Sequence, residues 1–283
     1  MADALHWHAA GRVLDCSERT LVMGVVNVTP DSFSDGGRFL DPEAAVAHAL
    51  GLVEDGADIV DVGGESTRPG SDLVSAEEEQ GRVVPVIEGL AAAHPALAIS
   101  IDTRKPKVAE AALVAGACIV NDVSGGRSEG MFEVVRDSGA GIVLMHMLGE
   151  PKTMQEAPHY DDVVAEVREY LRERLEAAEF AGIRPEALCV DPGIGFGKNL
   201  EHNLALLRGL DALADLGRPL LVGPSRKRFI GTILDLPEGE RVEGTAGAVA
   251  WAVAHGANLV RVHDVKEIVR VVRVVDAIVR AEA

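Results

Sequence analysis

The chain has 283 residues, 47% of them hydrophobic and 25% charged, and its 45 acidic and 27 basic residues give a formal net charge of -18. This charge argues against nucleic acid or an anionic membrane as a partner, because both require a basic surface. No apolar run approaches the roughly 18 residues of a membrane helix, and the N-terminus lacks the features of a signal peptide. The three cysteines (Cys16, Cys118 and Cys189) are odd in number and widely spaced, so we expect buried, reduced thiols in a cytoplasmic protein.

The expected elements begin with a hairpin over residues 5–18, closed around Ala9-Ala10-Gly11. Short apolar runs follow, each with the length and composition of a strand buried on both faces. They lie at 21–28, 57–62, 97–101, 118–120, 141–146, 188–191, 219–223 and 258–263. Helical patterns separate them, and the clearest are at about 161–181 and 199–215.

Eight alternations of strand and helix in one chain of this length predict a (β/α)8 TIM barrel, with residues 1–283 forming a single domain. An open, doubly wound sheet is the competing architecture. The count of eight, with no domain boundary between the units, favours the barrel.

Polar residues stand at or just beyond the ends of the predicted strands. In chain order they are Asn27, Asp61, Asp102, Asn121, His146, Asp191, Ser225 with Lys227, and Arg261 with His263. A TIM barrel carries its active site at the carboxyl ends of its strands, so we expect most of these side chains to meet there. Asp122 or Asp264 is instead expected to cap a helix.

Three of these residues suit a flat heterocycle. Asp102 and Asp191 provide carboxylate acceptors, and Asn121 provides an amide that both donates and accepts. An amino-pyrimidinone edge, with a ring N–H beside an exocyclic NH2, matches such a set. His146 is expected to line the barrel without a direct role, and Lys198 to be a surface charge at a helix start.

A second set suits an anion and a cation. Arg68, Lys227, Arg261 and His263 are anion ligands, and phosphate sites of barrels often follow the last two strands. Asn27, with Asp35 in the loop behind it, supplies oxygen ligands for a hard cation such as Mg²⁺.

Seven motifs, at residues 27–37, 63–70, 100–103, 121–126, 191–198, 225–229 and 261–264, occur in order over most of the chain. Together they resemble the dihydropteroate synthase family. The resemblance implies a folate-pathway transferase that joins 4-aminobenzoate to 6-hydroxymethyl-7,8-dihydropterin diphosphate with Mg²⁺, giving 7,8-dihydropteroate and diphosphate. It also implies a homodimer and sensitivity to sulfonamides.

The resemblance assigns roles by position. It implies that Asp102, Asn121, Asp191 and Lys227 hold the pterin. The implied diphosphate ligands are Asn27 (through Mg²⁺), Arg68, Arg261 and His263. The loops through Asp35, Ser66, Thr67, Arg68 and Pro69 would close over the site. Thr67, Pro69, Phe196, Ser225 and Lys227 would frame the aminobenzoate. The expected catalytic residues are Lys227, Arg261, His263, Asp102 and Asp35.

Two other functions remain open at this point. A pterin-binding methyltransferase would share the barrel and the acidic pterin edge but would have no use for the diphosphate ligands. A catalytically silent pterin-binding partner of another chain is expected to have lost one of Asp102, Asp191, Lys227 or Arg261, and all four are present.

Overall fold

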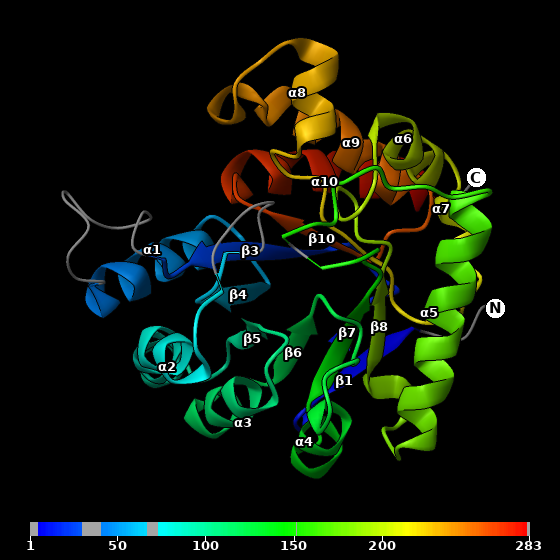
Figure 1. Ribbon diagram of the computed structural model, residues 1–283. Helices are drawn as coiled ribbons and strands as arrows, with labels where there is room; N and C mark the ends of the chain where they lie inside the picture. The colour runs from blue at the N-terminus through cyan, green and yellow to red at the C-terminus, as the bar shows by residue number, and fades with distance from the viewer. Residues whose placement is uncertain (1–4, 30–40, 67–72, 151, 282–283) are drawn as a thin grey trace.

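The computed structural model describes residues 5–29, 41–66, 73–150 and 152–281. In this part of the chain an eight-stranded parallel sheet has the order β8-β7-β6-β5-β4-β3-β10-β9. An isolated parallel bridge between Val190 and Leu220 joins its two end strands. The sheet thus curls into a nearly closed barrel with helices around it (Figure 1), which confirms the TIM barrel over the open sheet.

The strands are short and buried. Their bounds are β3 Leu21–Asn27, β4 Ile59–Gly63, β5 Ala98–Asp102, β6 Ile119–Asp122, β7 Gly141–Met145, β8 Leu188–Asp191, β9 Leu221–Val222 and β10 Leu259–Val262. Every predicted run overlaps one of them, and β4, β5 and β6 each extend one or two residues beyond the predicted run. Side chains of each strand alternate between the barrel interior and the layer under the helices, so both faces are covered.

The helices are α1 Pro42–Glu54, α2 Ala76–Ala93, α3 Pro106–Ala115, α4 Met131–Ser138, α5 Val163–Phe180, α6 Leu200–Arg208, α7 Leu210–Ala214, α8 Arg228–Leu234, α9 Val242–Ala254 and α10 Val265–Val279, with 3-10 turns at Pro185–Ala187 and Glu238–Glu240. Their starts follow from local chemistry: Ser75 caps α2 by accepting the Glu78 N–H, and Asn199 forms a capping box with His202. The single helix predicted over 199–215 is wrong, because it breaks at Gly209.

The N-terminal hairpin consists of β1 His6–Ala9 and β2 Arg12–Asp15, as predicted. Its Trp7 is fully buried and donates from Nε1 to the Ala187 carbonyl at 3.0 Å. Trp7 packs with residues that begin the strands, among them Leu21 and Ile59. The hairpin therefore closes the amino end of the barrel and leaves the carboxyl end for the site.

All three cysteines are buried free thiols, as expected. Within the described residues, we find no helix with both the length and the apolar character needed to cross a membrane.

Candidate active site

The register of the sheet brings several predicted site residues to one edge. Gly63 lies beside Asn27 on one side and Asp102 on the other, and Asp102 lies beside Asn121. Asp191 ends β8 next to Met145 at the end of β7. Because all these strands are parallel, their carboxyl ends form one rim.

A buried ion-pair network occupies the barrel beneath this rim. Arg261 of β10 donates from Nε to Asp61 Oδ2 at 2.6 Å and from Nη2 to Asp102 Oδ2 at 2.7 Å. The same Oδ2 of Asp61 accepts from Asn121 Nδ2 at 2.9 Å. The two sets that the sequence separated, one for the heterocycle and one for the anion, are thus directly bonded to each other.

Several acceptors in this network have no partner. Asp61 Oδ1, Ser100 Oγ and Asp102 Oδ1 are buried polar atoms without a hydrogen bond within the described residues. A buried acceptor without a donor is costly. These atoms are therefore suited to receive the N–H groups of a ligand.

Burial changes the protonation of the carboxyl groups. Burial raises the pKa of Asp102 to about 7, with Asp61 and Glu79 adding to the increase and Arg261 and Lys227 opposing it. Burial also raises the pKa of Asp191 to about 6, against the Gly193 N–H and nearby cations. Burial alone would lower the Arg261 pKa, but Asp61 and Asp102 reverse that effect and keep the guanidinium charged.

The glycine-rich loop after β8 is fitted closely to the neighbouring strand. Asp191 Oδ1 accepts from the Gly193 N–H at 2.6 Å. Gly193 has a φ of +66°, and a Cβ added there would lie 1.9 Å from the His146 carbonyl oxygen. Only glycine meets both conditions at this position.

Lys227 and Phe196 face each other across the site. The Lys227 Nζ lies 4.1 Å from the centre of the Phe196 ring, a cation–π contact between the loop after β9 and the loop after β8. Both side chains are half-buried.

Ser225 and His263 join the last two loops. Ser225 Oγ accepts from the His263 backbone N–H at 3.2 Å and lies 3.0 Å from His263 Nδ1. Burial and the charges of Arg261, Arg226 and Lys227 lower the His263 pKa to about 3. The ring is therefore neutral near pH 7, with one of its two nitrogens protonated. A neutral imidazole can still donate one N–H to an anion, so His263 stays a predicted anion ligand.

A model of the pterin binding enzyme family matches residues 23–263 of the chain. The dihydropteroate synthase of Escherichia coli strain K12 is 49% identical over 274 residues, which cover 97% of this chain and 96% of that protein. The chain belongs to the dihydropteroate synthase family. It is accordingly an enzyme of the transferase class.

Solved structures of the same family agree in fold. The dihydropteroate synthase of Xanthomonas albilineans with 4-aminobenzoic acid superposes with a TM-score of 0.92 at 50% identity, covering 99% of this chain and 100% of that one. The structure of the Xanthomonas albilineans enzyme in complex with 7,8-dihydropteroate has a TM-score of 0.88 at 47% identity, covering 98% of this chain and 100% of that one.

Some predicted residues of this family's site lie outside the described residues, namely Asp35, Thr67, Arg68 and Pro69. Ser66 and Asn27 are described and half-buried. Beside them, Glu65 accepts from the Val74 N–H at 2.9 Å.

The expected helix caps are absent from Asp122 and Asp264. Asp122 accepts from the N–H groups of Ser124 and Gly126, which forms a turn well before the next helix. Asp264 precedes α10 without a capping bond and instead pairs with Arg226 through two hydrogen bonds of 3.1 and 2.5 Å. Arg226 thus joins two loops and is not a free anion ligand.

The sequence does not predict the contacts of two residues at the site, Asp61 and Lys198. Asp61 was recognised as polar at a strand end, but nothing in its local pattern shows that it pairs with Arg261 from the far end of the chain. The prediction that Lys198 is a surface charge is wrong, because only 3% of the residue is exposed. Its position after a glycine loop was the only available signal.

The predicted Mg²⁺ ligand can be tested against its surroundings. Asn27 offers an amide oxygen, which is a hard ligand. No cluster of three or more His, Cys, Asp or Glu side chains able to hold a metal occurs among the described residues. Mg²⁺ often takes one or two protein oxygens and completes its shell with water and substrate phosphate. Asn27 fits the ion as one ligand of such a shared site.

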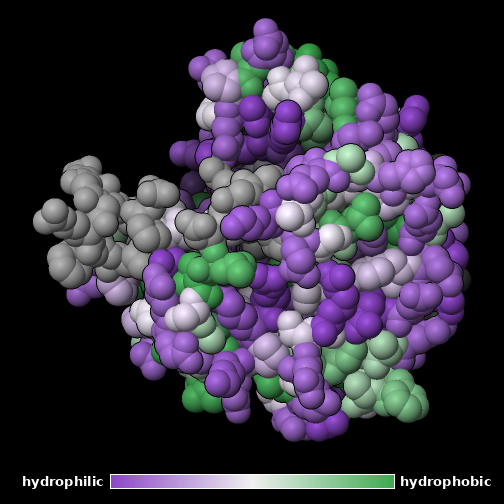
Figure 2. All heavy atoms as spheres, viewed as in Figure 1, coloured by the Kyte–Doolittle hydropathy of each residue, from purple (hydrophilic) through white to green (hydrophobic). Residues whose placement is uncertain are grey.

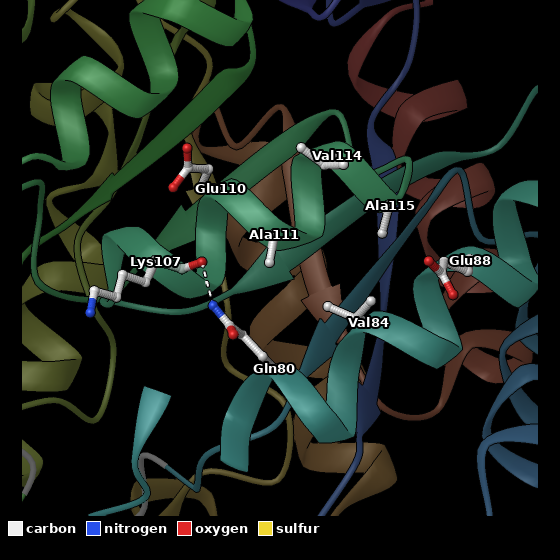
Figure 3. Close-up of a pocket in the computed structure, with 8 residues that line it drawn as sticks. All are labelled: Gln80, Val84, Glu88, Lys107, Glu110, Ala111, Val114 and Ala115. Atoms are coloured by element: carbon white, nitrogen blue, oxygen red, sulfur yellow. Dashed lines mark hydrogen bonds between the residues drawn. The ribbon is translucent and has the colours of Figure 1, made fainter. Parts of the chain in front are cut away.

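An open groove of about 600 Å³ lies elsewhere, on the outside of the barrel between α2 and α3. Figure 3 shows that Val84 and Ala111 face it, with Gln80 donating to the Lys107 carbonyl across its end. It contains none of the residues expected for the site.

Proposed function

We propose that this chain condenses 6-hydroxymethyl-7,8-dihydropterin diphosphate with 4-aminobenzoate to give 7,8-dihydropteroate and diphosphate. The observation that carries the proposal is the bonding of Arg261 to Asp102 beneath the rim. It brings a permanent cation for the diphosphate next to a carboxylate with an unpaired, buried oxygen for the pterin.

The pterin end is recognised by acceptors. Asp102 Oδ1 and the carboxylate of Asp191 accept the ring and exocyclic N–H groups, while Asn121 is held by Asp61 and matches the carbonyl edge. Lys227 completes this set from the loop after β9. A ligand without these donors would leave buried carboxyl groups unpaired, which gives specificity.

The diphosphate end is recognised by donors. Arg261 supplies fixed positive charge, and His263 supplies the single N–H of a neutral imidazole. Asn27 would hold Mg²⁺, which supplies further positive charge to the departing diphosphate when it is bound. Such groups stabilise the negative charge that grows as the C–O bond breaks.

In the proposed reaction the C–O bond of the pterin methylene breaks first and its electron pair leaves with diphosphate. The dihydropterin ring delocalises the resulting methylene cation. The amine of 4-aminobenzoate then forms the C–N bond, and the proton it loses passes to the released diphosphate or to water. The protein binds and orients both partners and excludes water, so no protein nucleophile is required.

The aminobenzoate is proposed to lie against Phe196 and Lys227, close to Ser225. The cation–π pair presents an aromatic face and a positive charge to an aromatic acid. We expect sulfonamides to compete there, because they share the aryl amine.

Diphosphate release tests the proposal. In the steady state, the wild-type protein is expected to release diphosphate over many turnovers only when pterin diphosphate, Mg²⁺ and 4-aminobenzoate are all present, and chelation of the metal is expected to stop this turnover. Lys227→Ala is expected to lose most of the activity. Pterin binding without turnover would instead indicate the silent relative, and methyl transfer from methyltetrahydrofolate would indicate the methyltransferase.

The sequential path needs a separate experiment. Single-turnover mixing of enzyme, Mg²⁺ and pterin diphosphate without 4-aminobenzoate is expected to show a burst of diphosphate. Absence of any release before amine is added would contradict the cation intermediate.

We also propose a homodimer in the cytoplasm. Ile233 and Leu234 of α8, Trp251 of α9, and Val274 and Ile278 of α10 are exposed apolar residues, and Figure 2 shows apolar atoms over α8 at the top of the molecule. Exposed apolar residues on neighbouring helices suit an interface. Sedimentation of the wild type and Trp251→Glu is expected to give a dimer and a monomer, respectively.

A further inference from the structure

Lys198 is a buried amine for which the proposed reaction has no direct use, and burial lowers its pKa to about 7 against the opposing effect of Asp191. It follows the glycine-rich loop, and its Nζ has three hydrogen-bond partners: His146 Nδ1 at 2.9 Å, the Gly193 carbonyl at 3.0 Å and the Phe196 carbonyl at 2.9 Å. An ammonium has three N–H donors. In the protonated form each donor is therefore used within the protein, and none remains for a substrate.

The three partners of Lys198 connect the glycine-rich loop to the end of β7. The Phe196 N–H donates to the Gly193 carbonyl at 3.0 Å, so residues 193–196 form a turn. Lys198 binds the carbonyls at both ends of that turn. Its third bond attaches the turn to His146, which directly follows β7.

His146 is suited to accept this bond. Burial lowers its pKa to about 2, with Lys198 as the next contributor. The imidazole is thus neutral, and its Nδ1 lone pair points to the ammonium. Tyr170 lies edge-on to the same ring at 4.8 Å and holds its orientation.

The rest of the loop has other attachments. Gln155 donates to the Gly195 carbonyl at 2.7 Å, Tyr160 donates to the Gly197 carbonyl at 2.9 Å, and Asn203 accepts from the Gly195 N–H at 2.7 Å. The Phe196 carbonyl, by contrast, has Lys198 as its only partner within the described residues. Loss of the ammonium would therefore leave the Phe196 carbonyl without this partner, while the Phe196 N–H keeps its bond to the Gly193 carbonyl.

We propose that Lys198 is a positioning residue that fixes the Phe196 ring and thereby governs the binding of 4-aminobenzoate more than that of the pterin. This inference rests on the function proposed above. Asp191, the pterin residue nearest to the turn, has its own bond from the Gly193 N–H, so the pterin end keeps its anchor when Lys198 is replaced.

The test uses Lys198→Met, which keeps the aliphatic stem and removes the donors. At saturating pterin diphosphate and Mg²⁺, the KM for 4-aminobenzoate is expected to rise about tenfold or more, in line with loss of a hydrogen bond from a charged group. The Kd of the pterin alcohol (6-hydroxymethyl-7,8-dihydropterin, the substrate without its diphosphate), measured by calorimetry, is expected to stay within about threefold of the wild-type value. Lys107→Met, an exposed lysine of α3, serves as the matched control and is expected to change neither constant.

A double-mutant cycle with Phe196 tests whether Lys198 acts through the Phe196 ring or stabilises the site in general. If Lys198 acts through the Phe196 ring, Lys198→Met in a Phe196→Ala background is expected to change the KM for 4-aminobenzoate by less than about twofold. Additive effects of the two changes would overturn the proposal. Equal losses of pterin and aminobenzoate affinity would also overturn it.

Folding and function are controlled separately. If Lys198→Met fails to fold, Lys198→Gln, which keeps two N–H donors, replaces it. The KM for 4-aminobenzoate and the Kd of the pterin alcohol are then compared in that variant. Wild-type turnover with an unchanged KM in the variant would reject the role of Lys198 and leave the proposed function intact. Absence of turnover in the wild type would reject the proposed function itself.

Discussion

Arg261 and Asp61 stand 200 positions apart in the chain and meet at 2.6 Å between Nε and Oδ2 inside the barrel. Asp61 is fully buried, and the same oxygen also accepts from Asn121. One carboxylate therefore orients an amide proposed for the pterin and a guanidinium proposed for the diphosphate. The two proposed substrate-recognition regions therefore share a single support.

Replacing that support is expected to impair both regions. Asp61→Asn keeps the shape but removes the charge, so kcat/KM for pterin diphosphate is expected to fall about 10- to 100-fold, as for loss of a charged hydrogen bond worth ~1.5–3 kcal/mol. Steady-state diphosphate release measures it. Asp58→Asn is the control, because Asp58 pairs with the exposed Arg19; a similar loss there would contradict the prediction.

Pterin affinity is expected to depend on the ionisation of Asp102. Its pKa of about 7 means that the carboxylate form increases as the pH rises from 6 to 8, and only this form accepts two N–H donors. Affinity for the pterin alcohol is expected to rise over the same range. In Asp61→Asn the midpoint is expected at lower pH, because Asp61 helps to raise the Asp102 pKa. Titration calorimetry across this range checks both statements.

Asp191→Asn is expected to stabilise the protein while weakening pterin binding. Burial raises the Asp191 pKa from 3.8 to about 6, so the folded state holds this proton more tightly, and that stability is lost as the pH rises from about 4 to 6. Asparagine stays neutral and can still accept the Gly193 N–H. Urea denaturation is expected to show a gain of about 1–3 kcal/mol at pH 8 that disappears near pH 4. A less stable variant at pH 8 would be evidence against this account.

Substituting two glycines, Gly193 and Gly217, distinguishes the cost of a steric clash from the cost of backbone strain. Gly193 and Gly217 have φ values of +66° and +69°, but an added Cβ would lie 1.9 Å from the His146 oxygen at Gly193 and would meet nothing within 4 Å at Gly217. Gly217→Ala is therefore expected to cost ~1 kcal/mol from conformation alone. Gly193→Ala is expected to cost several times more. Comparable unfolding free energies for the two variants would rule out the close approach.

The barrel and most of its rim follow from local patterns in the sequence. Apolar runs that end in polar residues determine where strands stop, and parallel strands place those ends on one edge. Asp102, Asn121 and Asp191 lie in the last residues of their strands, as these patterns predict, and the N-terminal hairpin follows from its turn.

The tertiary structure alone decided which of these residues contact each other. The bond from Arg261 to Asp61, the burial of Lys198 against His146 and the pairing of Asp264 with Arg226 all join segments distant in sequence. A residue's type and its neighbours in the chain limit what it can bond to. Closure of the barrel brings distant partners together, and the same burial sets the charge states of Asp102, Asp191 and His263.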